Sequence, residues 1–355
     1  MLRALRLAER GRGCTSPNPV VGAVIVRGGR VVGEGWHHAL GEPHAEQEAL
    51  AQAGAQARGA TMYVTLEPCA HSGRTPPCVD ALIRSGIRRC VVATRDPHDI
   101  VDGRGFRRLR RAGVRVTVGL CGEIARRSLG GYWKVHTRGL PRVTWKVAAT
   151  FDGRIADARG RSRWITGPRA RRLAHRMRAG ADAVVIGART ARLDDPRLTA
   201  RGMRGARQPL RVVCDGRLEL PATLRLFGPR LGPGTVVACT RGAPAARATR
   251  LERQGVRVWR LPGQGEFVSP VRLARRLAAE GRHELMLEGG AALGTAWLKA
   301  GLVDRIALFI APRLLGAESL DWCGPLGLRG LGRARGGRIV SCARVGEDAL
   351  VELEV

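Results

Sequence analysis

The chain has 355 residues, which is enough for two domains that each bury a core of their own. Its formal net charge is +31, yet it contains only three lysines, so arginines supply nearly all of the 61 basic side chains and are spread through both halves. A net charge alone predicts only non-specific attraction, so we expect no specific nucleic-acid partner. No run of about 18 apolar residues predicts a membrane span.

The start of the chain and its cysteines indicate a reducing compartment. The first residues lack the apolar core and the cleavage site of a signal peptide, so we expect a cytoplasmic protein. The nine cysteines occur at scattered spacings, unlike a disulfide framework, and the cytosol keeps thiols reduced. Two of them are better explained as metal ligands.

The first predicted elements are a helix and a hairpin joined by a proline-rich loop. Apolar residues at helical spacing predict a helix over residues 2–10. Two prolines then stiffen the loop around Asn18, and residues 20–26 and 30–35 predict a β-hairpin. An amide fixed at this position could read the hydrogen-bonding edge of a pyrimidine, or Asn18 could be only a turn residue.

The next stretch, residues 43–78, contains residues typical of a zinc site. It reads P-H-A-E and then E-P-C-A-H-S-G-R-T-P-P-C. His44, Cys69 and Cys78 are three ligands of the kind that hold Zn²⁺ and leave a fourth position for water. We expect His44 and Cys78 in the first turns of two helices, where the helix dipole favours a thiolate.

Glu46 and His71 are the polar neighbours of these ligands. Glu46 lies too close to His44 to be a comfortable fellow ligand but is able to reach a metal-bound water, so we expect it to transfer protons. A structural zinc site usually closes with a fourth Cys or His. His71 could be that ligand, but it is only two residues from Cys69, and we prefer it as a substrate contact.

The rest of the first half predicts a mixed sheet. Strands are expected over 64–66, 88–94 and 114–118, alternating with helices, which favours a three-layer α/β/α sandwich. The domain is expected to end near 134–141, with a short linker over 136–141. The eight residues between the two cysteines distinguish the site from base deaminases with a P-C-x-x-C motif, because the longer loop brings additional polar side chains to the pocket.

The second half again alternates strands and helices, which predicts a second α/β domain. We expect a helix over 169–179, a polar loop over 190–201, and strands over 141–150, 183–187, 210–214, 234–239 and 256–259. Residues 284–298 predict a strand that runs through glycines into a helix, whose N-terminus could face a pyrophosphate. Glycines also serve tight turns for steric reasons alone, and this is not a G-x-G-x-x-G fingerprint.

These motifs closely resemble a known family, the bifunctional riboflavin-biosynthesis deaminase/reductases of bacteria. The first half carries H-A-E, E-P-C-x-H-x-G-R-T-P-P-C, S-P-N-P-V-V-G and D-P-x-x-x-V-x-G-R-G. The second half matches in order at Lys146, D-G-R-I-A, S-R-W-I-T, D-D-P-x-L-T, E-G-G and A-P-x-L-L-G. The resemblance implies a cytidine-deaminase-like zinc domain over 1–138, followed by a dihydrofolate-reductase-like NADPH-dependent domain over 139–355.

The resemblance also implies roles for individual residues. By it, His44, Cys69 and Cys78 bind zinc and Glu46 is the proton donor. It implies substrate contacts in the second domain at Ser162, Arg178, Leu198, Arg201 and Glu288. It implies NADPH contacts at Ala148, Trp164, Thr190, Asp194, Gly290, Ala291, Ala292, Leu293, Gly294, Thr295 and Ala296. The two arginines could clamp a phosphate with their forked donors, or be solvent-exposed like many others in this chain.

The implied chemistry is a sequence of two reactions on one small phosphorylated pyrimidine. Zinc-dependent hydrolytic deamination of 2,5-diamino-6-ribosylamino-4(3H)-pyrimidinone 5′-phosphate is followed by NADPH reduction of the ribosyl chain of 5-amino-6-(5-phosphoribosylamino)uracil to ribityl. We expect a homo-oligomer with no membrane partner. Two alternatives remain: a deaminase of RNA bases, and a binding or regulatory protein with a degenerate reductase half.

Overall fold

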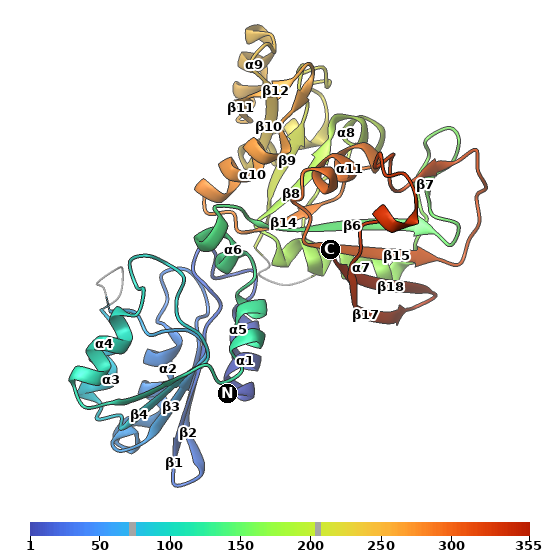
Figure 1. Ribbon diagram of the computed structural model, residues 1–355. Helices are drawn as coiled ribbons and strands as arrows, with labels where there is room; N and C mark the ends of the chain where they lie inside the picture. The colour runs from blue at the N-terminus through green and yellow to red at the C-terminus, as the bar shows by residue number, and fades with distance from the viewer. Residues whose placement is uncertain (71–75, 203–206) are drawn as a thin grey trace. The chain divides into compact units, whose positions relative to one another are not determined.

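The computed structural model of the chain describes residues 1–70, 76–202 and 207–355. It divides into two compact units, Met1–Leu140 and Pro141–Val355, whereas the sequence analysis placed the boundary after residue 138. Figure 1 shows both units and their elements. Within the described residues, none of the helices has both the length and the apolar character required to cross a membrane.

The first unit is built on a five-stranded mixed sheet. Its strands are arranged in the order β2-β1-β3-β4-β5. β1 is antiparallel to both of its neighbours, whereas β3, β4 and β5 run parallel. The bounds are β1 (Gly22–Arg27), β2 (Arg30–Trp36), β3 (Thr61–Val64), β4 (Arg89–Val92) and β5 (Arg115–Val118). The expected strand over 64–66 is therefore misplaced, because the chain leaves the regular ladder after Val64 and turns toward the cysteine loop.

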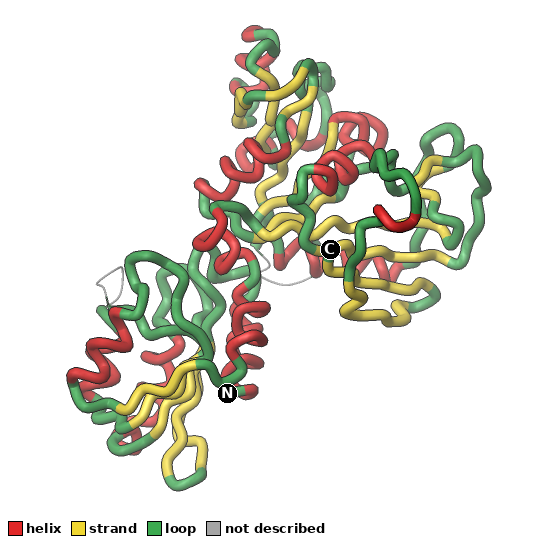
Figure 2. Tube along the Cα trace, viewed as in Figure 1, coloured by secondary structure: helices red, strands yellow, loops and turns green. Residues whose placement is uncertain are grey.

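Helices cover both faces of this sheet, as Figure 2 shows. One face packs α2 (Ala45–Ala53), α3 (Cys78–Arg84) and α4 (Arg104–Arg111), and the other packs α1 (Leu2–Ala8) and α5 (Gly122–Leu129). The short 3-10 turns are η1 (Glu9–Gly11) and η2 (Gly54–Ala57). The three-layer α/β/α sandwich expected from the alternation of strands and helices is confirmed.

The expected linker over 136–141 is wrong for its first half. Residues Gly131–Arg138 form α6, which ends at Gly139 in the left-handed conformation. The helix is anchored because Tyr132 is buried and its hydroxyl donates to Asp96 Oδ1 at 2.9 Å. The sequence did not predict this helix, because a single buried tyrosine among mostly polar residues produces no periodic pattern of apolar residues.

Close packing of α2 on β2 fixes the position of His44, the first residue of the predicted zinc site. An ideal Cβ on Gly35 would lie 2.4 Å from the backbone oxygen of Ala45 and 2.5 Å from Glu48 Cβ. Only glycine therefore allows the first turn of α2 to approach the strand this closely. His44 is the N-cap of this helix with extended backbone, not a residue of its first turn as expected, whereas Cys78 is the first residue of α3.

The second unit contains a nine-stranded sheet in the order β11-β10-β9-β8-β14-β6-β15-β18-β17. The strands from β11 to β15 run parallel, and β18 and β17 continue the sheet antiparallel. The bounds are β6 (Arg142–Thr150), β8 (Ala183–Gly187), β9 (Leu210–Cys214), β10 (Thr235–Thr240), β11 (Arg257–Leu261), β14 (Glu284–Leu287), β15 (Arg305–Ala311), β17 (Arg338–Val345) and β18 (Asp348–Glu354).

Helices and small ribbons complete this unit. The helices are α7 (Pro168–Gly180), α8 (Ala188–Asp194), α9 (Ala245–Glu252), α10 (Pro270–Ala279) and α11 (Ala291–Lys299), with 3-10 turns η3 (Arg225–Phe227), η4 (Gly232–Gly234) and η5 (Leu331–Arg333). The ribbons pair β7 (Arg154–Ala156) with β16 (Leu320–Asp321) and β12 (Gly263–Gln264) with β13 (Phe267–Val268). The expected polar loop over 190–201 is wrong for its first five residues, because α8 extends to Asp194.

α7 and α11 lie on opposite faces of β6. α7 packs on the face of the strand that carries Ala148. α11 packs against Trp145, which points to the opposite face because side chains alternate along a strand. Gly294 makes this contact possible, because an ideal Cβ there would lie 2.0 Å from the Trp145 ring. The sheet thus holds the start of α11 and one end of α7 at fixed places relative to β6.

Substituting Gly35→Ala should destabilise the first unit by about 1–3 kcal/mol, because the added methyl overlaps backbone and side-chain atoms of α2. Hydrogen exchange of peptides from each unit in increasing urea would measure this. The matched control is Gly180→Ala at the end of α7, where an ideal Cβ meets nothing within 4 Å. Equal stability of the two variants would contradict the packing argument.

Candidate functional site

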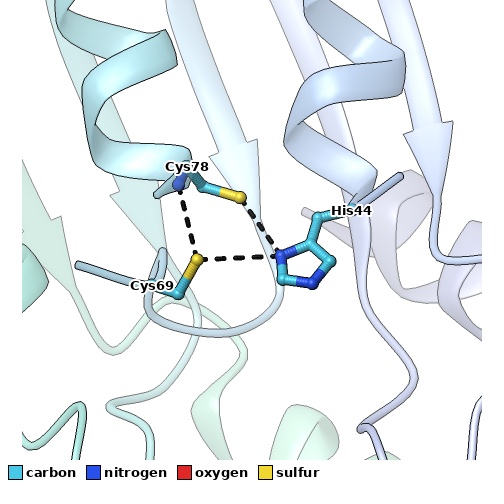
Figure 3. A group of neighbouring side chains, drawn as sticks. All are labelled: His44, Cys69 and Cys78. Carbon is cyan, nitrogen blue, oxygen red and sulfur yellow. Dashed lines mark hydrogen bonds between the residues drawn. The ribbon is translucent and has the colours of Figure 1, made fainter. Parts of the chain in front are cut away.

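The three predicted zinc ligands come together in the first unit. His44 caps α2, Cys69 lies in the coil after β3, and Cys78 opens α3. His44 Nδ1 lies 3.2 Å from Cys78 Sγ and 3.7 Å from Cys69 Sγ (Figure 3). The backbone N–H of Cys78 donates to Cys69 Sγ at 3.4 Å, so the start of α3 supports the thiolate.

This donor set fits a zinc ion. In a tetrahedral zinc site, sulfur and nitrogen ligands are about 3.5–3.8 Å from one another, close to the separations seen here. Hydrogen bonding from Cys78 and from His44 lowers the pKa of Cys69 to about 4, so this sulfur is ready to bind a cation. The same contact with Cys69, together with burial, raises the pKa of Cys78.

Glu46 lies beside these ligands in the first turn of α2. Its side chain is buried, only 4% exposed, and it contacts Cys78. Burial raises the pKa of Glu46 to about 7, although the nearby charge of His44 acts in the opposite direction. A carboxyl group with a pKa near neutrality both takes up and releases a proton, as a general acid–base group requires.

Asn18 is connected to this cluster through His37, a residue that the sequence analysis missed. His37 Nδ1 lies 3.0 Å from the carbonyl oxygen of Pro43, which can only accept, so Nδ1 carries the proton. His37 Nε2 then accepts from Asn18 Nδ2 at 3.2 Å. The His37 ring also meets His44 edge to face, with centroids 5.3 Å apart. The sequence offers no signal that separates buried His37 from its neighbour His38.

A second missed residue, Glu67, holds the loop that follows β4. Its buried carboxylate accepts from the backbone N–H groups of Gly103 at 3.1 Å and Gly105 at 3.0 Å. Asp96, at the start of the same loop, accepts from the backbone N–H of His98 at 2.9 Å. The D-P-x-x-x-V-x-G-R-G motif is therefore tied to the residue two positions before Cys69. His71 lies outside the described residues.

In the second unit, the predicted substrate residues Arg178 and Glu288 contact each other. Arg178 Nη2 donates to Glu288 Oε2 at 2.7 Å, and Arg178 Nε donates to Oε1. Burial acts to raise the pKa of Glu288, but Arg178 and the partly buried Lys146 outweigh it and lower that pKa. Two donors of the Arg178 fork are thus occupied, so this arginine does not present the open clamp that the sequence suggested.

The other predicted substrate residues flank this pair. Ser162 Oγ donates to Asp194 Oδ1 at 3.1 Å, which joins a predicted substrate residue to a predicted cofactor residue. Arg201 Nη2 donates to Nε2 of His175 at 3.2 Å. The side chain of Leu198 packs in the apolar core, and its backbone has a φ of 51°. Only its main chain is therefore placed to meet a ligand.

The predicted cofactor residues around α11 fall into two groups. Some are exposed or partly exposed near the start of the helix, and others are buried where the helix packs against the rest of the unit. Thr190 Oγ1 accepts from the backbone N–H of Gly290 at 3.4 Å, so α8 meets the N-terminus of α11. Ala291 and Leu293 are partly exposed, and Ala292 and Ala296 are exposed. By contrast, Gly294 and Thr295 are buried: the glycine meets Trp145, and the threonine accepts from the Gly324 N–H at 2.8 Å.

Trp164 and Ala148 occupy different environments. Trp164 is 62% exposed, and the guanidinium of Arg171 lies 4.6 Å from its ring centroid. This contact presents a flat aromatic surface to solvent beside a cation. Ala148 is partly buried on β6 and packs against the core beneath α7.

Comparison with known proteins assigns each unit to a known domain. Residues 1–94 match the model of the cytidine and deoxycytidylate deaminase zinc-binding region, and residues 141–351 match that of the RibD C-terminal domain. The riboflavin biosynthesis protein RibD of Aquifex aeolicus is 42% identical over 351 residues, covering 99% of this chain and 96% of that protein.

Two solved structures agree. RibD of Acinetobacter baumannii, in form 2, matches with a TM-score of 0.89 and 36% identity over 99% of this chain and 97% of that one. A diaminohydroxyphosphoribosylaminopyrimidine deaminase/5-amino-6-(5-phosphoribosylamino)uracil reductase of Thermotoga maritima matches with a TM-score of 0.86 and 33% identity, over 100% and 97%. The chain therefore belongs to the RibD family of riboflavin biosynthesis proteins, and it joins a zinc-dependent deaminase to an NADPH-dependent reductase.

Proposed function

We propose that each unit catalyses one of two successive reactions and that the residues described above perform them. The first unit deaminates 2,5-diamino-6-ribosylamino-4(3H)-pyrimidinone 5′-phosphate. The second reduces the ribosyl chain of the product, 5-amino-6-(5-phosphoribosylamino)uracil, to ribityl. The observation that carries this proposal is the His44–Cys69–Cys78 cluster beside buried Glu46, in a chain whose second unit is a RibD reductase domain.

In the first unit, His44 Nδ1 and the sulfurs of Cys69 and Cys78 would hold the zinc ion. When bound, zinc lowers the pKa of a water molecule to about 7 and so supplies a nucleophile at neutral pH. The Glu46 carboxylate transfers two protons in turn: the first passes from the water to the ring nitrogen, and the second passes from the resulting hydroxyl group to the amino group, which leaves as ammonia. One water is consumed, and an amino group becomes a carbonyl group.

Asn18 is proposed to orient the pyrimidine in this site. Because His37 Nε2 accepts from Asn18 Nδ2, the orientation of the amide is fixed and Oδ1 remains as an acceptor. The N–H groups of a diaminopyrimidinone are suitable donors to such an oxygen. His71 stays a proposed substrate contact.

In the second unit, the residues around Lys146 and Glu288 are proposed to hold the sugar phosphate, while NADPH supplies the hydride. The paired carboxylate and guanidinium of Glu288 and Arg178 offer fixed hydrogen-bonding partners for sugar hydroxyls. Arg201 retains its charge for the phosphate. The start of α11, where Gly290 caps the helix next to Thr190, is suited to the cofactor's pyrophosphate.

The proposed setting is the cytoplasm, with the protein acting as a homo-oligomer. The described cysteines are free, including exposed Cys14 and Cys342, which suits a reducing compartment. No specific nucleic-acid partner is proposed, because the reaction uses a small phosphorylated pyrimidine.

Removing one zinc ligand should empty the metal centre. Cys69→Ala is expected to lose the bound zinc, because two ligands hold the ion far less tightly than three. Mass spectrometry of the metal content after gel filtration measures this. Cys14→Ala, which removes an exposed cysteine of the same unit, should keep its zinc. Full zinc content in Cys69→Ala would contradict the assigned ligand set.

Glu46→Gln should keep zinc and lower the rate of ammonia release by about 10²- to 10⁴-fold, because the amide cannot transfer protons. Ammonia is measured with the diaminopyrimidinone nucleotide. Glu48→Gln, in the same helix but partly exposed, serves as the matched control and should retain activity. An active Glu46→Gln enzyme would exclude the proton-transfer role.

Arg201→Ala should raise the KM for the deaminated nucleotide by about 10- to 100-fold, the usual effect of losing a charge-assisted contact to phosphate. The rate of NADPH oxidation provides the measurement. Arg250→Ala, which removes an exposed arginine from α9, should leave the KM unchanged. A similar KM in both variants would argue against a phosphate contact at Arg201.

A further inference from the structure

His175 on α7 connects the loop after α8 to Arg201. Its Nδ1 lies 3.0 Å from the carbonyl oxygen of Thr199, and a carbonyl oxygen can only accept. Nδ1 therefore carries the proton, which leaves Nε2 as an acceptor. Arg201 Nη2 donates to that nitrogen at 3.2 Å. The neutral imidazole thus joins the main chain of the loop to the guanidinium two residues further along.

The loop that carries Arg201 is held from both sides. Arg178 Nη1 donates to the same Thr199 oxygen at 3.3 Å. On the other side, Ala200 exchanges two hydrogen bonds of 2.9 Å with the side chain of Gln208. The main chain at Thr199 and Ala200, directly before Arg201, is therefore held in place, and the end of the Arg201 side chain contacts His175.

Arg201 has no carboxylate partner among the residues that the structure describes, unlike two arginines close to it. Arg178 is paired with Glu288, and Arg225 is paired with Asp195 at 2.8 Å. Burial and the charges of Arg178, Arg197 and Arg225 lower the pKa of Arg201, which shows that cations gather around it. This corner of the unit therefore has an excess of positive charge, and Arg201 contributes a charge that no carboxylate of the described residues neutralises.

We propose that His175 is a positioning residue that orients the Arg201 guanidinium to receive the phosphate monoester of the pyrimidine nucleotide. The inference rests on the proposed function. A carboxylate partner would orient Arg201 equally well, but it would cancel the charge and compete with the phosphate. A neutral imidazole nitrogen orients the guanidinium and leaves its charge available.

The surroundings of His175 keep it in the neutral form that this role needs. Burial and the charges of Arg178 and Arg201 lower the pKa of His175, while Thr199 and Glu288 act in the opposite direction. Protonation would place a third cation beside the two arginines and remove the acceptor at Nε2. The arginines therefore favour the neutral imidazole, while the contact with the Thr199 oxygen sets which nitrogen carries the proton.

A phosphate group could also come from NADPH, through its 2′-phosphate, so the test must separate the two sources. His175→Asn retains a donor near Nδ1 for Thr199 but has no acceptor at the position of Nε2. We expect this variant to raise the KM for the deaminated nucleotide about tenfold while the KM for NADPH stays unchanged. A rise confined to the KM for NADPH, absent with NADH, would overturn the assignment to the substrate.

A double-mutant cycle with Arg201→Ala distinguishes positioning from a merely structural role. If His175 acts through Arg201, the double variant has the same KM as Arg201→Ala alone. Multiplied effects in the double variant would refute the inference. Unchanged thermal unfolding and an unchanged KM for NADPH verify that the unit is folded.

The wild-type enzyme separates this inference from the proposed function on which it rests. If the wild type oxidises no NADPH with the deaminated nucleotide, the proposed function fails. If the wild type is active and His175→Asn has the same KM as the wild type, only the role of His175 fails.

Discussion

One imidazole nitrogen lies between two sulfurs that arrive from separate parts of the fold, and the first unit is arranged to make that possible. His44 reaches the cluster from the N-cap of α2 and Cys78 from the first residue of α3. Gly35 lets α2 approach the sheet, and Glu67 ties the loop after β4 to the coil that holds Cys69. A small displacement of either helix would separate the nitrogen and sulfur atoms that are proposed to bind one zinc ion.

The two units control charge in opposite ways. In the first, burial raises the pKa of Glu46 to about 7, and a carboxyl group becomes a proton carrier. In the second, Glu288 remains charged although it is buried, because Arg178 and Lys146 surround it. Among the described residues, Arg201 has no counter-ion and contacts a neutral imidazole instead. This division suits proton transfer in one reaction and recognition of a phosphorylated sugar in the other.

The sequence predicted the parts that depend on local spacing. The residues of the His44, Cys69 and Cys78 cluster, the hairpin, and the strand-to-helix turn before α11 were all visible in short motifs. Contacts between distant residues were not: Arg178 pairs with Glu288, 110 positions away, and this contact changed the expected phosphate clamp. His37, Glu67 and His175 were missed because each acts through hydrogen bonds to residues that are distant in the sequence. Helix α6 was missed because one buried tyrosine gives no periodic pattern.

The central claim is that one chain performs deamination and then reduction on the same nucleotide. Its most direct test supplies the zinc-loaded protein with the diaminopyrimidinone nucleotide and NADPH, and follows ammonia and NADPH together. The account predicts that ammonia release precedes NADPH oxidation and that the two finally match mole for mole. NADPH oxidation in the absence of ammonia release would contradict the order of the reactions, and ammonia release that no oxidation follows would contradict the reductase role of the second unit.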